Sequence, residues 1–151
     1  MEKFKILLVD DEEDFVTNLS ERLQLRDLDS GTALDGESAM QIVKDEVPDV
    51  MVLDLKMPGI DGMEVLRRVK KKYPKVQVII LTAHGTKKDE TEAKKLGAFA
   101  FLQKPVDLES LMEVMKRAYR AGLEKTYAAA AFAEEGMFDT ARSIMDDQKK
   151  K

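Results

Sequence analysis

Three short runs of apolar residues stand out along the chain, and none of them alternates regularly with polar residues. Continuous runs rich in Val, Ile and Leu are typical of strands buried on both faces, as in a mainly parallel sheet covered by helices. A shorter aromatic run and a weaker, more polar segment are two further strand candidates. In chain order, the expected strands are residues 5–9, 30–35, 50–55, 76–81 and 98–102.

The segments between these runs carry apolar residues at helical spacing, as at Phe15, Leu19 and Leu23. The last such segment opens with Asp107, a residue type favoured at helix N-caps. Five strand–helix pairs in succession predict an α/β fold with a doubly wound parallel sheet and helices on both faces. The expected helices cover residues 15–23, 36–44, 63–69, 86–97 and 107–119.

The helix at 86–97 is the least well supported, because Ala93 and Leu96 are its only clear apolar anchors. A helix with so few anchors should pack weakly and belong to the less stable, more easily moved part of the fold.

The strand–helix alternation stops after Tyr119. The remaining residues indicate a continuation of the last helix, a turn at Gly136 and a second short helix. The pattern from Ala131 to Ala141 resembles half of a tetratricopeptide-type hairpin, but such units need neighbours to bury their faces. We therefore favour a helical extension that packs on its own domain or on a second subunit.

Composition narrows the class of protein. The 151 residues are 44% hydrophobic, contain no cysteine and carry a formal net charge of −4. The absence of cysteine excludes disulfides and thiolate metal sites, and the acidic balance argues against a protein that grips nucleic acid. No segment reaches the roughly 20 apolar residues needed to span a bilayer. We expect a cytoplasmic protein with no membrane and no direct nucleic-acid partner.

Polar residues follow four of the expected strands. Asp10 and Asp11 follow the first, Asp54 ends the third, Thr82 ends the fourth, and Lys104 follows the fifth. Because the carboxyl ends of parallel strands meet at one edge of the sheet, these side chains should converge there. Carboxylate oxygens without His or Cys suit a hard cation, typically Mg²⁺. A lysine and a hydroxyl beside that ion would form a site for phosphoryl oxygens.

Other polar residues near this edge have simpler interpretations. Glu12, Glu13 and Asp14 lie where the first helix should begin, and acids there are favoured by the helix dipole. Asp61 is expected only to start the next helix. The single histidine, His84, is expected to be a solvated loop residue. A further hypothesis is that His84 and Lys56 affect how long a phosphoryl group bound at this edge survives.

Four motifs together resemble the receiver domain of bacterial two-component response regulators: LLVDDEEDF, VLDLKMPGIDG, IILTAHG and GAFAFLQKP. The resemblance covers residues 3–120 and leaves 121–151 as a helical hairpin extension or tail. It implies a flavodoxin-like five-stranded sheet of order 2-1-3-4-5. The short remainder implies a single-domain response regulator rather than a direct transcription factor.

The resemblance also implies roles for individual residues. Asp54 would be the phosphoacceptor, taking a phosphoryl group from a phosphohistidine of a sensor histidine kinase or phosphotransfer protein. Thr82 and Lys104 would each bind a phosphoryl oxygen, and Phe101 would occupy the aromatic switch position. The peptide bond between Lys104 and Pro105 would be cis. The expected Mg²⁺ ligands are Asp10 (through water), Asp11, Asp54 and the backbone carbonyl of Lys56.

The leading interpretation is therefore a phosphorylation-dependent signalling switch, with no enzymatic activity beyond its own phosphotransfer and autodephosphorylation. One alternative is a haloacid-dehalogenase-type phosphatase, although the sequence Asp10-Asp11 lacks the Asp-x-Asp spacing of that class. Another is a receiver-shaped scaffold that is never phosphorylated. Output would pass to an unknown downstream protein, and a homodimer could form through residues 86–119 or through the tail.

Overall fold

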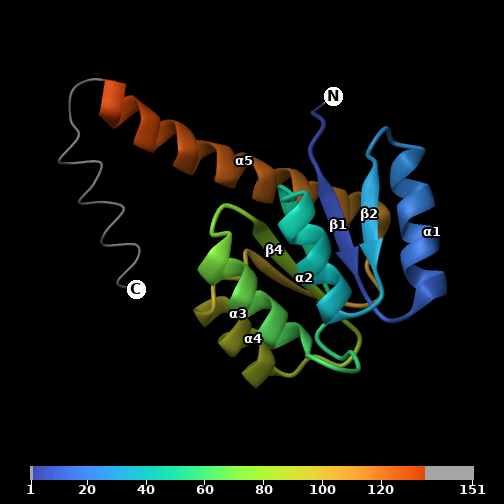
Figure 1. Ribbon diagram of the computed structural model, residues 1–151. Coiled ribbons are helices and arrows are strands. Elements are labelled where there is room, and N and C mark those ends of the chain that lie inside the picture. Colours follow the sequence, from blue (N-terminus) through green and yellow to red (C-terminus); the bar gives the residue numbers. More distant parts are fainter. Residues whose placement is uncertain (1, 135–151) are drawn as a thin grey trace. The chain divides into compact units, whose positions relative to one another are not determined.

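The computed structural model describes residues 2–134, with side chains up to residue 125. In this part of the chain, five strands alternate with five helices (Figure 1). All five predicted strands and all five predicted helices are present. The elements are β1 (Ile6–Val9), α1 (Glu13–Gln24), β2 (Ser30–Ala33), α2 (Gly36–Asp45), β3 (Val50–Leu53), α3 (Gly62–Lys72), β4 (Gln77–Thr82), α4 (Lys87–Lys95), β5 (Ala100–Gln103) and α5 (Leu108–Glu134).

The strands form one parallel sheet in the order β2-β1-β3-β4-β5. This confirms the doubly wound topology and the strand order that the family resemblance implied. The register places Val9 of β1 opposite both Ala33 of β2 and Leu53 of β3. The strands therefore end at a common edge, and the residues that follow them begin their loops side by side.

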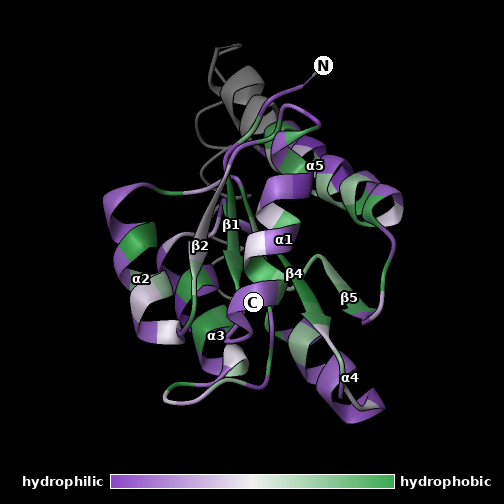
Figure 2. Cartoon of the chain, turned by 90° about the vertical axis from the view of Figure 1, so that its right-hand side faces the viewer, coloured by the Kyte–Doolittle hydropathy of each residue, from purple (hydrophilic) through white to green (hydrophobic). Residues whose placement is uncertain are grey.

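Each face of the sheet has its own hydrophobic core, because successive strand residues point to opposite faces. On one face, Ile6 and Leu8 pack with buried residues of α1 and α5. On the other, Leu7 and Val9 pack with buried residues of α2, α3 and α4. Figure 2 shows the same division, with hydrophobic colour on β1 and β4 and hydrophilic colour over the outer surfaces of the helices.

Local capping fixes where several helices begin, close to the edge at which the strands end. Asp35 accepts a hydrogen bond from the Ser38 backbone at the start of α2, and Asp61 accepts one from Glu64 at the start of α3. Asp61 thus starts its helix, as predicted. These caps satisfy N–H groups that have no partner within the helix.

The start of α1 differs in detail from the expectation. Glu13 and Asp14 occupy its first turn, where the dipole favours acids. Glu12 occupies the N-cap position, but its side chain forms no capping hydrogen bond and instead lies 3.4 Å from the Lys104 ammonium. The helix dipole alone therefore does not account for Glu12, because the Lys104 ammonium also attracts its carboxylate.

The helix α4 is held as weakly as its sequence predicts. Ala93 is its one fully buried residue, and Leu96, just past its end, is only partly buried. Its start is fixed instead by a capping box in which Thr86 and Asp89 exchange hydrogen bonds. Polar caps thus define where α4 begins, while little apolar burial holds it to the sheet.

The last helix continues beyond Tyr119, as predicted. The chain divides into two compact units, Met1–Tyr119 and Arg120–Lys151, and α5 reaches Glu134. The proposed turn at Gly136, the second short helix and most of the tetratricopeptide-like pattern lie outside the described residues. None of the helices in residues 2–134 combines the length and apolar character required to cross a membrane.

Candidate functional site

Two buried carboxylates lie side by side at the carboxyl edge of the sheet. Asp10 and Asp54 directly follow the paired residues Val9 and Leu53. The Asp54 backbone N–H donates to the Val9 carbonyl (2.9 Å), and the Asp10 N–H donates to that of Ala33 (3.1 Å). The strand ladders thus extend one residue further and hold both acids in place, with only 3% of Asp10 and 6% of Asp54 exposed.

Asp11 completes a group of three acids. It is exposed in the loop after β1, yet one oxygen from each of Asp10, Asp11 and Asp54 lies within 4.8 Å of the others. Three carboxylates at this spacing form an all-oxygen donor set suited to a hard divalent cation such as Mg²⁺. The structure therefore brings together the three acids that the sequence predicted as metal ligands. Lys56 lies two residues after Asp54, and the role of its carbonyl stays a prediction.

The environment of Asp54 disfavours its ionised form. Burial raises the pKa of this carboxyl, and the neighbouring Asp10 carboxylate raises it further. The Thr82 hydroxyl and then the Lys104 charge lower the pKa, but they oppose burial and Asp10 only in part, since the net shift remains upward. A divalent cation held by the three acids would relieve the same repulsion, so the donor set fits the metal electrostatically as well as geometrically.

Lys104, which directly follows β5, reaches this acid group along the same edge of the sheet. Its backbone N–H donates to the Thr82 carbonyl (2.9 Å), which continues the ladder between β4 and β5. Its ammonium lies 2.5 Å from Asp10 Oδ2 and 4.1 Å from the centre of the Phe15 ring. The Lys104–Pro105 peptide is cis, as the resemblance implied.

Opposing influences act on the ammonium of Lys104. Burial lowers the pKa of Lys104, but the hydrogen bond and charge of Asp10, supported by Asp54 and Glu12, outweigh burial and raise it overall. The lysine therefore remains a cation beside the acids.

Thr82 ends β4 with a fully buried side chain. Its hydroxyl Oγ1 meets no hydrogen-bond partner at full bonding geometry among the described residues, although it lies close enough to Asp54 to lower the pKa of that carboxyl. An unpaired buried hydroxyl costs about 1–3 kcal/mol, so Thr82 Oγ1 is a hydrogen-bond donor that a further acceptor at this edge would satisfy.

Phe101 lies in the middle of β5, half-buried against the core that contains α4. The loop between β4 and α4 passes so close to its ring that a Cβ added at Gly85 would lie 2.5 Å from Phe101 Cζ. The Gln103 side chain donates to the Gly85 carbonyl (2.9 Å) and joins the same loop to β5. His84, in this loop, is exposed as expected.

Three contacts of the site could not be read from the sequence: Glu12 with Lys104, Phe15 under the Lys104 ammonium, and Gln103 with Gly85. Each depends on side-chain direction in the folded chain rather than on residue type or spacing.

The sequence profile of the response regulator receiver domain matches residues 6–116 of the chain. The chain belongs to this family. A curated relative, sporulation initiation phosphotransferase F of Bacillus subtilis (strain 168), is 37% identical over 113 residues, which cover 75% of this chain and 91% of that protein. The receiver is accordingly a component of two-component phosphorelay signalling, and this membership replaces the haloacid-dehalogenase alternative.

Solved structures agree with the receiver fold. A receiver domain protein from Clostridium thermocellum is 35% identical, with a TM-score of 0.73 over 78% of this chain and 94% of that one. NtrX from Brucella abortus is 27% identical, with a TM-score of 0.82. The match covers 89% of this chain but only 30% of the NtrX chain, so this receiver corresponds to one part of that larger protein.

Proposed function

We propose that Asp54 is the phosphoacceptor of this receiver and that its phosphorylation switches the β4–α4 region between two arrangements. The observation that carries the proposal is the convergence of Asp10, Asp11 and Lys104 around the buried Asp54 carboxylate. The phosphoryl donor would be the phosphohistidine of a sensor histidine kinase or of a phosphotransfer protein.

The transfer forms one bond and breaks one. An Asp54 carboxylate oxygen attacks phosphorus, the phosphorus–nitrogen bond of the donor histidine breaks, and the imidazole keeps the electron pair and takes up a proton. Phosphoryl transfer depends on positioning and charge neutralisation, so a general base is not required. Mg²⁺ would be held by Asp11, Asp54 and the Lys56 carbonyl directly and by Asp10 through water, and it would neutralise charge on the phosphoryl oxygens.

Two residues of the chain then recognise the product. The Thr82 hydroxyl, unpaired in the structure, donates a hydrogen bond to one phosphoryl oxygen, and the Lys104 ammonium pairs with another. Movement of Thr82 toward the phosphoryl group opens space beside Phe101, whose ring already contacts the loop that leads into the weakly held α4. The Thr82 bond exists in only one state, which is the differential contact that a switch requires.

The test is the intact mass of the protein after incubation with acetyl phosphate and Mg²⁺. We expect a gain of one phosphoryl group that disappears in Asp54→Asn and in EDTA, and persists in the exposed control variant Asp29→Asn. An adduct that survives in Asp54→Asn would refute the assignment of the phosphoacceptor.

If no adduct forms, a fluoroberyllate titration followed by NMR separates two explanations. Shifts at Thr82 and Phe101 would indicate a competent switch with fast hydrolysis. No shifts, under conditions in which Mg²⁺ binds, would favour the scaffold that is never phosphorylated.

The output partner is proposed to be another protein or a second copy of the chain. Residues 86–119 include α4, which is held weakly, and are the surface that phosphorylation would change. Sedimentation with and without fluoroberyllate tests the homodimer, which predicts a larger mass only in the activated form.

A further inference from the structure

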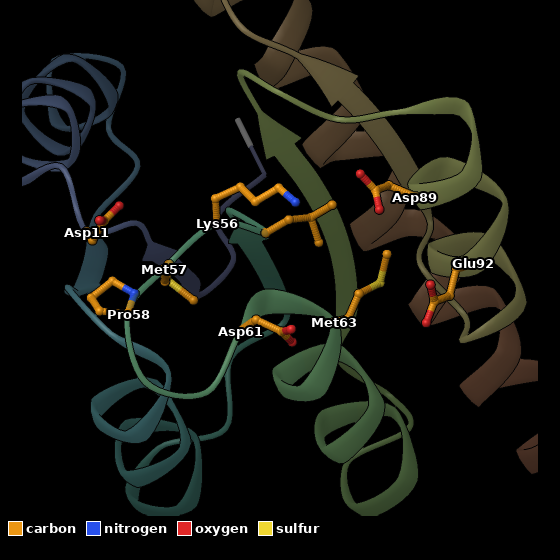
Figure 3. Close-up of a pocket in the computed structure, with 9 residues that line it drawn as sticks. Asp11, Lys56, Met57, Pro58, Asp61, Met63, Asp89 and Glu92 are labelled. Carbon is orange, nitrogen blue, oxygen red and sulfur yellow. The ribbon is translucent and has the colours of Figure 1, made fainter.

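A cleft of about 550 Å³ lies beside the acid site, between the loop after β3, the start of α3 and the helix α4 (Figure 3). Asp11 belongs both to this cleft and to the group of acids around Asp54. The cleft is therefore next to the phosphoacceptor but is not the phosphoryl pocket, since neither Thr82 nor Lys104 lines it.

The apolar part of the cleft lining consists of Leu55, Pro58 and two methionines, Met57 and Met63. Met57, from the loop, is almost buried, while Met63, on α3, is half-buried and rises between Asp61 and Glu92 in Figure 3. Methionine is flexible and polarisable, so it adapts to apolar side chains of different shapes. Cleft volumes in this range hold several side chains of a ligand or partner.

Among the residues that line the cleft, negative side chains outnumber positive ones. Four carboxylates line it, from Asp11, Asp61, Asp89 and Glu92, against the single ammonium of Lys56. Figure 3 shows Lys56 reaching toward Asp89 and not toward Asp61. Glu92 also borders a neighbouring hollow that Lys88 and Lys95 line. Neither Asp61 nor Glu92 forms a salt bridge with another residue in the described part of the chain.

From this combination we propose that the cleft is a docking site for a basic amphipathic helix of a partner protein. Its apolar side chains would pack on Met57 and Met63, and its lysine or arginine side chains would pair with Asp61 and Glu92. Methionine-containing grooves with acidic rims suit such helices, and the negative charge disfavours nucleic acid. The inference rests on the proposed function in one respect, since it places this partner beside the phosphoacceptor.

The probe is a helix-forming peptide of leucine and lysine, about 15 residues long, compared with the same peptide carrying glutamine in place of lysine. Binding is followed by NMR of methionine methyl groups, with Met57 and Met63 assigned through Met57→Leu and Met63→Leu. Met40, half-buried on α2, is the reporter away from the cleft. We expect the lysine peptide to shift Met57 and Met63 and to leave Met40 unchanged.

The variant that tests the charges is Asp61→Ser with Glu92→Gln, because serine can still cap α3. Loss of two exposed charge pairs should weaken binding of the lysine peptide about fivefold. The control pair Glu21→Gln with Glu37→Gln makes the same change in net charge at exposed positions outside the cleft, and should alter affinity by less than about twofold.

Three outcomes would overturn the inference: equal binding of the glutamine peptide, shifts confined to methionines outside the cleft, or equal weakening by both variant pairs. Spermidine is titrated as well, and full reproduction of the shifts by this small polyamine alone would also overturn it. Labelling by acetyl phosphate is measured on the same samples. Failure of both labelling and the fluoroberyllate shifts, with intact peptide binding, would reject the proposed function alone. Labelling without peptide binding would reject the docking site alone.

Discussion

Replacement of Asp54 by asparagine should stabilise the metal-free protein, although it removes the proposed phosphoacceptor. Asp54 and Asp10 are both buried, and their oxygens lie within 4.8 Å of each other. Two like charges at that separation repel by about 3 kcal/mol at an effective dielectric constant near 20. Lys104 offsets part of this repulsion through Asp10. We therefore expect Asp54→Asn to raise the free energy of unfolding by about 2 kcal/mol at neutral pH without metal.

The pH dependence gives the prediction a second, independent signature. The pKa of Asp54 is raised above the ordinary value of 3.8, so the native state holds this proton to a higher pH than the unfolded state. The contribution of this proton to the free energy of unfolding is fully present below pH 3.8. It is lost as the pH rises through the raised pKa of Asp54 in the native state. The advantage of Asp54→Asn should therefore be largest at neutral pH and should shrink as the pH falls toward 3.8.

Urea unfolding in EDTA, followed by circular dichroism, measures both effects. The matched control is Asp29→Asn, an exposed position where the change should stay within about 0.5 kcal/mol. Added Mg²⁺ should stabilise the wild type more than Asp54→Asn, because the variant lacks one ligand of the acid group. An Asp54→Asn variant no more stable than wild type in EDTA, with Asp29→Asn unchanged, would refute the repulsion argument.

Further predictions concern other parts of the receiver. Lys104→Met should lower the free energy of unfolding in urea by about 2 kcal/mol, because it leaves the buried Asp10 carboxylate without its cation. Leu66→Ala, at a fully buried position of α3, should cost about 3 kcal/mol in the same assay. Asp35→Ala should lower the thermal midpoint at neutral pH and by less below 3.8, because hydrogen bonds from Ser38 lower the pKa of Asp35 and their benefit is lost on protonation. His84→Ala should change the rate at which a phosphorylated sample loses its phosphoryl group, measured by intact mass over time; an unchanged rate would remove His84 from the site.

The fold was predictable because its strongest signal is local. Continuous apolar runs such as 76–81 form strands buried on both faces. The segments between them, with apolar residues at helical spacing, form helices. The convergence of Asp10, Asp54 and Thr82 followed from the same signal, since parallel strands bring their carboxyl ends to one edge. Strand order, by contrast, came from the family resemblance, because no local pattern states which strand pairs with which.

What the sequence could not show depends on side-chain direction. Glu12 is one of five consecutive acids, and nothing in its position distinguishes a carboxylate that faces Lys104 from one that faces water. Asp61 was expected only to begin α3, yet it also lines the cleft. Gln103 precedes the lysine without any spacing rule that would link it to Gly85. Such contacts need the three-dimensional positions of residues far apart in the chain.

The features that destabilise the site are also those that would operate the switch. The site contains an acid, Asp54, whose ionised form is disfavoured by burial, and a buried hydroxyl, that of Thr82, with no hydrogen-bond partner among the described residues. Under the proposed mechanism, bound Mg²⁺ offsets the negative charge at Asp54. The phosphoryl group on Asp54 then gives the Thr82 hydroxyl an acceptor. The free energy of the Thr82–phosphoryl hydrogen bond is gained only when Thr82 moves. Movement of α4 costs little, because Ala93 is its one fully buried residue. A better-satisfied site would make a more stable protein, but it would leave less difference in free energy between the two states and so a weaker switch.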